Sequence, residues 1–325
     1  MTTAPDDPDW MRPLGATGLM VSAVTAGGGP LGSMPENFGY EVAEADAVGL
    51  VRDILDSPIR TIDTSNGYSG GASERRIGLG IAEYIQQHGG LPRNSLVITK
   101  VDARDGDYSG ARVRASVAES SARLGIEPLP LVHLHDPEFH DFETMTAPGG
   151  AVDTLVRLRD EGIVGHIGLA GGDVHQMARY LALDVFEVLL VHNRWTLVDH
   201  SAKDLIEDAK ARGVAVVNAA IYGGGILAAP ERGLTSYGYR PARPETLAAI
   251  ARMDALARTN GTDLATVALQ SSLRDPLVTT TVVGFSKPER IDSILAATRV
   301  ELSDEFWDEI DALRPSPENW LDAES

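Results

Sequence analysis

The strongest constraint on the fold is an alternation of short apolar runs with longer amphipathic stretches along the whole chain. Runs rich in Val, Ile and Leu predict strands, and apolar residues at helical spacing predict helices between them. The predicted strands are residues 21–27, 60–65, 96–101, 129–135, 165–170, 185–192, 214–220 and 279–284. The predicted helices are residues 43–56, 73–88, 110–124, 150–161, 173–183, 201–212, 243–260 and 288–298.

Strict alternation of this kind predicts an α/β fold, a parallel (β/α)8 TIM barrel. The runner-up is an open doubly wound sheet, which usually carries GxGxxG after its first strand. The stretch AGGGPLG that follows the first predicted strand lacks that spacing. We therefore expect the closed barrel.

Three segments depart from a bare barrel. Residues 1–20 predict a short hairpin that closes the barrel floor, and residues 303–313 predict an extra C-terminal helix. Residues 221–242 form a Gly- and Pro-rich connection long enough to act as a lid.

No linker divides the chain, so we expect a single domain over residues 1–325. Residues 1–11 and 315–325 are expected to be tails.

The charge balance restricts the partners. With 28 basic and 47 acidic residues the formal net charge is −19, so nucleic acid and anionic membranes are not expected to bind. The absence of cysteine excludes disulfides and thiolate metal sites, and no metal site is predicted. The polar N-terminus and the lack of a long apolar run predict a cytoplasmic protein whose partner is a small molecule.

Polar residues at the C-terminal ends of predicted strands are the candidates for chemistry, because barrel active sites lie there. Asp63 lies at the end of the apolar run of predicted strand two, Tyr68 lies in the loop after strand two, and Lys100 and His135 lie at the ends of the apolar runs of predicted strands three and four. Taken singly they could be a loop cap, a loop aromatic, a solvated charge and a core histidine. Together they form a closed set, because an ammonium stabilises a phenolate and a carboxylate holds the ammonium. This set favours proton transfer to or from a carbonyl oxygen.

Five blocks in order resemble the aldo-keto reductase superfamily over residues 12–313: DTSNGYSGGASERRIG, VITK, LHDP, GIVGHIGLAG and VVGFSKPERI. The resemblance implies that Tyr68 is the general acid/base, that Lys100 and Asp63 tune it, and that His135 orients the substrate. His135 is preferred to His133, which lies one layer deeper on the same strand, because the family's histidine precedes a residue and then proline.

The branch of aldose dehydrogenases, acting on L-fucose, D-threo-aldoses or pyridoxal, is the most similar on AGGGPLG, LHDPE and VHNRWTLVD. It implies oxidation of a sugar lactol to a lactone or of a related alcohol, with hydride transfer to NAD or NADP, and NAD is preferred for that direction. Expected to line the mouth are Trp195, Tyr222, Tyr237, Tyr239, Asn193 and Arg194. The predicted substrate-binding residues are Tyr68, His135 and Trp195.

The nucleotide is expected at the C-terminal rim of the barrel. SKPERI places cations at a helix start, a favoured phosphate site, and the glycines of YGGGIL allow close approach of a pyrophosphate. Ala170 and Gly171 stand where many relatives have Ser-Asn, so Asn193 is assigned to the carboxamide. The predicted nucleotide-binding residues are Gly28, Gly29, Asp63, Asn193, Tyr222, Gly223, Gly225, Leu227, Ser286, Lys287 and Arg290.

Three different functions stay open. The chain could be a general aldehyde or ketone reductase that uses NADPH. Lys100 could form a Schiff base in an aldolase, because a lysine at a strand end of a barrel suits that role when its pKa is lowered. The chain could also be a regulatory subunit that binds the nucleotide without turnover.

Overall fold

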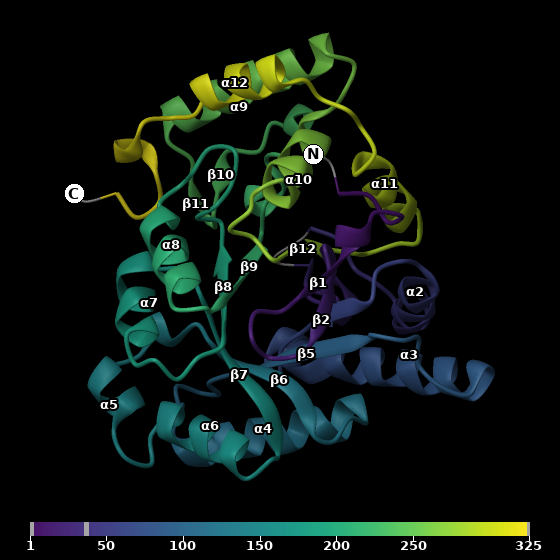
Figure 1. Cartoon of the computed structure of the whole chain (residues 1–325), viewed down its shortest axis with the longest axis vertical. Coiled ribbons are helices and arrows are strands. Elements are labelled where there is room, and N and C mark those ends of the chain that lie inside the picture. Colours follow the sequence, from purple (N-terminus) through teal and green to yellow (C-terminus); the bar gives the residue numbers. More distant parts are fainter. Residues whose placement is uncertain (1–2, 36–38, 324–325) are drawn as a thin grey trace.

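The strands close into a parallel barrel. The computed structural model describes residues 3–35 and 39–323. Around the barrel the strands are β12 (Thr280–Gly284), β3 (Val24–Gly27), β4 (Thr61–Asp63), β5 (Leu96–Val101), β6 (Leu129–His135), β7 (Val164–Gly171), β8 (Val188–His192) and β9 (Ala215–Ala219). All eight neighbouring pairs are parallel, which confirms the predicted fold (Figure 1).

Helices form a layer outside the strands. They are α2 (Glu44–Asp56), α3 (Ala72–His88), α4 (Gly110–Leu124), α6 (Ala151–Asp160), α7 (Val174–Leu181), α8 (Lys203–Ala211), α10 (Leu264–Leu273) and α11 (Glu289–Ala297), with a short α5 (Phe142–Thr146) after β6. Among the described residues no helix combines the length and the apolar character needed to cross a bilayer.

The helix predicted at 243–260 does not cover the barrel. It is α9 (Pro244–Thr259), which packs with α12 (Asp304–Ala312) in a separate cluster at one end of the molecule (Figure 1). The helix against the strands is α10, whose Ser272 bonds Thr281 on β12 and Asn218 on β9, both at 2.8 Å. The prediction missed α10 because eight of its ten residues are buried, so it lacks a polar face.

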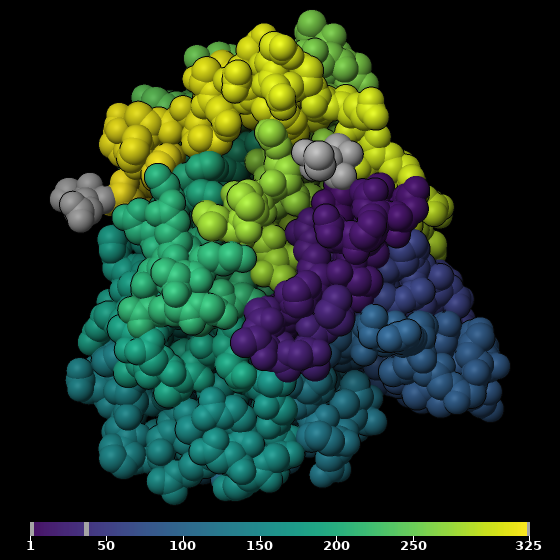
Figure 2. All heavy atoms as spheres, viewed as in Figure 1, coloured from purple at the N-terminus to yellow at the C-terminus, as the bar shows by residue number. Residues whose placement is uncertain are grey.

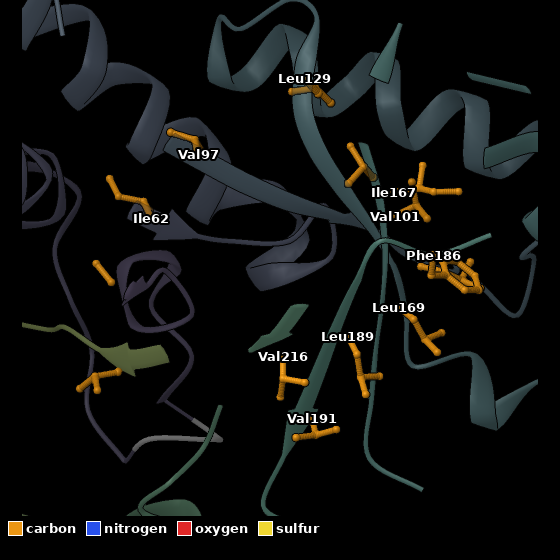
Figure 3. Packing of buried hydrophobic residues seen from close by; sticks show 14 of the residues in the cluster. Ile62, Val97, Val101, Leu129, Ile167, Leu169, Phe186, Leu189, Val191 and Val216 are labelled. Atoms are coloured by element: carbon orange, nitrogen blue, oxygen red, sulfur yellow. The ribbon is translucent and has the colours of Figure 1, made fainter. Parts of the chain in front are cut away.

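The core has two layers because side chains alternate along a strand. On β5 and β9, Ile98 and Val217 belong to the cluster inside the barrel, whereas Val97 and Val216 belong to the larger cluster shared with the helices. Figure 3 shows Val97, Leu189 and Val216 in that outer layer. The inward register of β5 therefore also points Lys100 into the barrel.

The predicted hairpin closes the barrel floor. Strands β1 (Met11–Pro13) and β2 (Met20–Ser22) pair antiparallel, so the strand predicted at 21–27 is divided between β2 and β3. Leu14 and Val21 are fully buried among the interior residues of the barrel. Figure 2 shows this N-terminal segment in purple across the surface.

The long connection after β9 is partly structured. It contains two short 3-10 turns, Gly223–Gly225 and Pro230–Arg232, and the strands β10 (Ser236–Tyr237) and β11 (Arg240–Pro241), which pair antiparallel.

The described parts of the expected tails pack onto the protein. The indole of Trp10 donates to the Pro58 carbonyl. At the other end, Asp322 accepts from Arg194 at 3.0 and 3.1 Å, and Arg243 donates to the Glu318 carbonyl. Residues 1–2 and 324–325 of the expected tails lie outside the described residues.

Candidate active site

Lys100 organises the centre of the site. Its ammonium donates to Asp63 Oδ1 at 2.5 Å and to the Thr64 carbonyl at 2.7 Å, and lies 3.3 Å from the hydroxyl of Tyr68. Burial alone lowers the pKa of Lys100, but the charge of Asp63, and then Tyr68, outweigh burial and raise it above its usual value. Lys100 is therefore a permanent cation in a nearly water-free position.

The hydroxyl of Tyr68 is a protonated phenol at neutral pH. Burial, the largest effect, raises the pKa of Tyr68 to about 12, while Lys100 opposes it. Asp63 and Asp102 add to the increase. The sequence predicts the stabilising action of the lysine but not that burial outweighs it. In this state Tyr68 can donate a proton, and a second positive charge nearby would favour its release.

His135 completes the predicted group. Its ring lies edge-on to that of Tyr68, with 5.8 Å between centroids and 76° between planes. Burial lowers the pKa of His135, yet Asp102 and then Asp136 raise it above the usual value. The hydroxyl of Tyr108 holds the backbone, because it accepts from the His135 amide at 2.9 Å and donates to the Val101 carbonyl at 2.7 Å.

The four predicted catalytic side chains thus lie together at the C-terminal ends of β4, β5 and β6. The deeper His133 is fully buried, and in the described structure neither ring nitrogen has a hydrogen-bond partner. Burial and then Lys100 hold the pKa of His133 well below its ordinary value, so it is neutral. Gly168 faces it from β7, where a Cβ would lie 2.2 Å from the ring. This geometry suits packing inside the barrel.

Asp102 is a functional candidate that the sequence-based prediction missed. Its Oδ1 lies 2.6 Å from Nδ1 of His135, and its Oδ2 accepts from the Gly67 amide at 2.7 Å and from the Ser65 hydroxyl. It follows Lys100 by two residues and therefore shares the inward side of that strand. That spacing was the available signal.

A buried ion pair holds the loop that carries Tyr68. Arg123 donates to the Asn66 carbonyl at 3.1 Å and to Glu74 at 3.0 Å, and Glu74 also accepts from Thr99 at 2.6 Å. Glu74 is fully buried. The loop position is therefore set by α3 and α4 as well as by the strands.

A group of polar side chains borders Asp63, Tyr68, Lys100 and His135, which we call the tetrad. Asp136, Glu138 and His192 offer ligand atoms that all lie within 4.8 Å of one another. Asp136 Oδ1 and Glu138 Oε2 are shielded from solvent and have no hydrogen-bond partner in the described structure. They are acceptors for hydroxyl or amide groups. The prediction that the protein binds no metal stays a prediction.

The predicted nucleotide residues fall into distinct environments. Gly28 and Gly29 are buried after β3, and the Gly28 amide donates to the Asp63 carbonyl at 2.6 Å. A Cβ on Gly28 would lie 2.9 Å from that oxygen. Close packing of two protein segments therefore explains this glycine.

The loop after β9 meets α11. The Arg290 guanidinium lies 5.3 Å from the ring centroid of Tyr222, so these two predicted residues are brought together. Gly223 and Gly225 both have positive φ, and a Cβ on Gly223 would meet the Tyr237 ring at 2.5 Å. Leu227 is fully buried in the cluster of α9 and α12, so its side chain is part of the core.

Next to Arg290, Lys287 is exposed and Ser286 is half-buried at the start of α11. Asn193, after β8, is fully buried, and its Oδ1 has no partner in the described residues. An unpaired buried oxygen and a cation over an aromatic ring fit a ligand with amide and phosphate groups. The residues present are thus compatible with a nicotinamide nucleotide.

Trp195 lies elsewhere. Its indole donates to Asp275 at 2.9 Å and stacks on His200 with centroids 4.1 Å apart. It lines a surface cavity of about 290 Å³ with Trp307 of α12. None of these contacts involves the tetrad, so the structure does not bring Trp195 together with Tyr68 and His135.

The other aromatic residues expected at the mouth also differ. Tyr237 is buried, where it donates to the Asn193 carbonyl and lies 2.8 Å from the Thr196 hydroxyl. Tyr239 is 66% exposed. Arg194 is buried in its ion pair with Asp322 and has no free charge to offer a ligand.

Comparison with known proteins gives consistent results. The model of the aldo/keto reductase family matches residues 26–315. L-galactose dehydrogenase of Arabidopsis thaliana is 31% identical, with 93% of each chain covered. D-threo-aldose 1-dehydrogenase of a Pseudomonas species is 27% identical, covering 93% of this chain and 97% of that protein.

Pyridoxal 4-dehydrogenase of Microbacterium luteolum is 28% identical, covering 91% of this chain and 95% of that protein. Among solved structures, the holo form of an aldo-keto reductase from Bacillus halodurans aligns with a TM-score of 0.73 and 20% identity. The alignment covers 97% of this chain and 99% of that one. This last likeness concerns the fold.

Proposed function

The chain belongs to the aldo/keto reductase family and is an oxidoreductase, and from this premise we propose that it is an NAD(P)-dependent dehydrogenase that oxidises the lactol hydroxyl of an aldose. Tyr68 is the general acid/base. The observation that carries the proposal is the ammonium of Lys100 placed between Asp63 at 2.5 Å and Tyr68 at 3.3 Å.

When bound, the nicotinamide supplies the acceptor or the donor of the hydride. On the protein side, the phenol of Tyr68 donates its proton to the carbonyl oxygen in reduction. In oxidation the phenol first releases its proton to solvent, and the resulting phenolate takes the hydroxyl proton. Lys100 stabilises the phenolate, and Asp63 keeps Lys100 in place without competing for the proton. His135 directs Nε2 at the oxygen that reacts. We assign Ser286, Lys287 and Arg290 to the phosphates, Asn193 to the carboxamide, and Tyr222 to covering the bound nucleotide.

The polar group beside the tetrad supports a hydroxyl-rich substrate. Asp136 Oδ1 and Glu138 Oε2 have no hydrogen-bond partner in the described structure, and Asp136 Oδ1 lies 3.7 Å from Nε2 of both His135 and His192. A sugar donates several hydroxyls in fixed directions, which such oxygens accept. Two of the similar relatives are named as dehydrogenases of an aldose, which points the same way.

A general aldehyde or ketone reductase that uses NADPH is the second candidate. The protonated state of Tyr68 at neutral pH suits reduction. The exposed cation Lys287 and the neighbouring Arg290 could meet a 2′-phosphate. We prefer NAD for the oxidative role.

The aldolase and the regulatory subunit have less support. A Schiff-base aldolase needs a neutral amine, whereas Asp63 raises the pKa of Lys100. A regulatory subunit without turnover would have no need of the Asp63, Tyr68 and Lys100 contacts. The cytoplasmic location expected from the sequence stays a prediction.

The test uses the full chain with L-galactose, D-threo-aldoses, pyridoxal and simple aldehydes, each with NAD and NADP in both redox states. Absorbance of the reduced nicotinamide reports turnover. We expect the highest kcat/KM for an aldose with NAD. Preference for simple aldehydes with NADPH would favour the second candidate, and nucleotide binding without any turnover would favour the regulatory subunit.

A further inference from the structure

Asp102 joins the two segments that carry Tyr68 and His135. One carboxylate oxygen accepts the Gly67 amide at 2.7 Å and the Ser65 hydroxyl, both just before Tyr68. The other lies 2.6 Å from Nδ1 of His135. An ionised carboxylate only accepts hydrogen bonds, so the proton between them belongs to Nδ1.

We propose that Asp102 is a positioning residue for the reaction: it keeps a proton on Nδ1 of His135, ties that ring to the loop of Tyr68 and so directs Nε2 at the reacting oxygen. Nε2 donates a hydrogen bond to that oxygen in the imidazolium form, which the negative charges of Asp102 and Asp136 favour, whereas in the neutral form it can only accept one. This inference rests on the proposed function. It adds to the tetrad a fifth side chain, which acts through His135 and does not touch substrate.

The surroundings of His135 leave Nε2 available. Several charged or titratable groups face the ring of His135. Lys100 comes from β5, Asp102 from the residue after that strand, and Tyr68 from the loop after β4. His133 and Asp136 come from β6 and the residue after it, and His192 of β8 lies on the far side of Asp136. The nearest carboxylate to Nε2 is Asp136 Oδ1 at 3.7 Å, which is too far for a hydrogen bond. The negative charge of Asp136 favours the protonated form of His135, but it does not determine which ring nitrogen carries the proton of the neutral form.

The local sequence makes room for this arrangement. A Cβ at Gly67 would lie 2.9 Å from Asp102 Cγ, so glycine allows the carboxylate to reach the backbone of the loop. Ser65 Oγ also lies 3.3 Å from Nδ1 of His135. The proton on Nδ1 therefore has two oxygens near it, Asp102 Oδ1 and Ser65 Oγ. Asp102 itself is 18% exposed, so water screens it only in part.

The substitution D102N reverses the direction of the hydrogen bond between residue 102 and Nδ1 of His135. An asparagine amide can keep the bonds from Gly67 and Ser65 through its oxygen, but its nitrogen then donates to Nδ1. The neutral ring would carry its proton on Nε2. The loss of the negative charge also lowers the pKa of His135, because Asp102 is the leading charge that raises it.

Nitrogen-15 NMR of the imidazole rings tests this directly without any substrate. The chain has 8 histidines, and the signals missing from an H135Q variant assign His135. In the wild type we expect the neutral ring to carry its proton on Nδ1. In D102N we expect the proton on Nε2 and a lower pKa. The control D105N changes an exposed aspartate of the same connection whose positive φ asparagine tolerates.

A wild-type ring protonated on Nε2 would overturn the proposal even if D102N failed to fold, and so would an unchanged tautomer in folded D102N. With the best substrate, D102N should lose roughly 10- to 100-fold in kcat with a smaller change in KM, the scale of carboxylates that orient metal-binding histidines. Unchanged kcat despite the altered tautomer would also overturn it. Absence of turnover in the wild type would reject the proposed function and leave the NMR result standing.

Discussion

The ammonium of Lys100 lies 3.3 Å from the hydroxyl of Tyr68 and 4.8 Å from the centroid of its ring, so one cation contacts both the hydroxyl and the aromatic face. The cation comes from β5, whereas the ring comes from the connection after β4. Their contact depends on the loop after β4, which folds back over the end of β5.

Tyr68→Phe removes the proposed acid/base and keeps the ring. We expect nucleotide binding to persist and kcat to fall by at least about a hundredfold, the usual scale for such a group. Steady-state kinetics and nucleotide fluorescence measure the two effects. Tyr84→Phe, on the outer helix α3, is the matched control. Normal turnover in Tyr68→Phe would reject the assigned role.

The pH dependence follows from the charge state of Tyr68. Its pKa of about 12 means that the base form grows as pH rises and that the acid form persists through neutral pH. Oxidation should therefore accelerate with increasing pH, while reduction stays level until strongly alkaline pH. Lys100→Met should shift to higher pH both the rise in the rate of oxidation and the fall in the rate of reduction, because Lys100 lowers the pKa of Tyr68. Rates with opposite or absent pH trends would contradict this.

Arg290→Ala tests the phosphate assignment. We expect the Kd of the nucleotide to increase while kcat changes little, because Arg290, which lies over Tyr222, is assigned to the phosphates and takes no part in the proposed proton transfer. Titration by fluorescence gives the Kd. Arg299→Ala, in a surface pair with Asp6, is the control. An unchanged Kd in Arg290→Ala would remove the assignment.

Glu74→Ala tests the support of the Tyr68 loop. It removes the buried carboxylate that Arg123 and Thr99 share, while Arg123 keeps the Asn66 carbonyl and Glu119. We therefore expect a loss of roughly 1.5 to 3 kcal/mol in the free energy of unfolding, the scale of hydrogen bonds to a charged group. Glu161→Ala breaks an exposed pair with Arg114 and should cost less than about 1 kcal/mol. Urea denaturation compares the two. Equal losses in the free energy of unfolding would show that the buried pair stabilises the protein no more than the exposed pair does.

Chelation tests the metal prediction. We expect EDTA to leave turnover unchanged, because the proposed proton transfer uses only the tetrad. A loss that a divalent cation restores would instead assign a metal to Asp136, Glu138 and His192.

The sequence predicted the barrel, and it predicted that Asp63, Tyr68, Lys100 and His135 lie close together, because strand ends in a parallel barrel converge on one rim. The catalytic roles of these residues stay a prediction. Asp102 and Tyr108 were missed because each acts on His135 through the fold, from the connection after β5. The position of Trp195 could not be predicted either. Residue spacing gives the side of a strand, but the direction of a loop side chain depends on partners such as Asp275 and His200.

The glycines show the same limit. Gly28 was predicted to bind the nucleotide, and the structure places the Asp63 carbonyl oxygen 2.9 Å from where a Cβ of Gly28 would lie. A glycine in a sequence marks a close approach without revealing what approaches. Helix α10 was not predicted for a related reason, since burial on nearly all sides removes the polar face that reveals a helix.

Leu14 and Val21 pack against the residues inside the barrel and close the end opposite to the tetrad. Under the proposed function, a proton that Tyr68 releases to solvent would leave by the same rim through which the reactants arrive. A seated ligand would block that route, which links the timing of proton release to ligand departure.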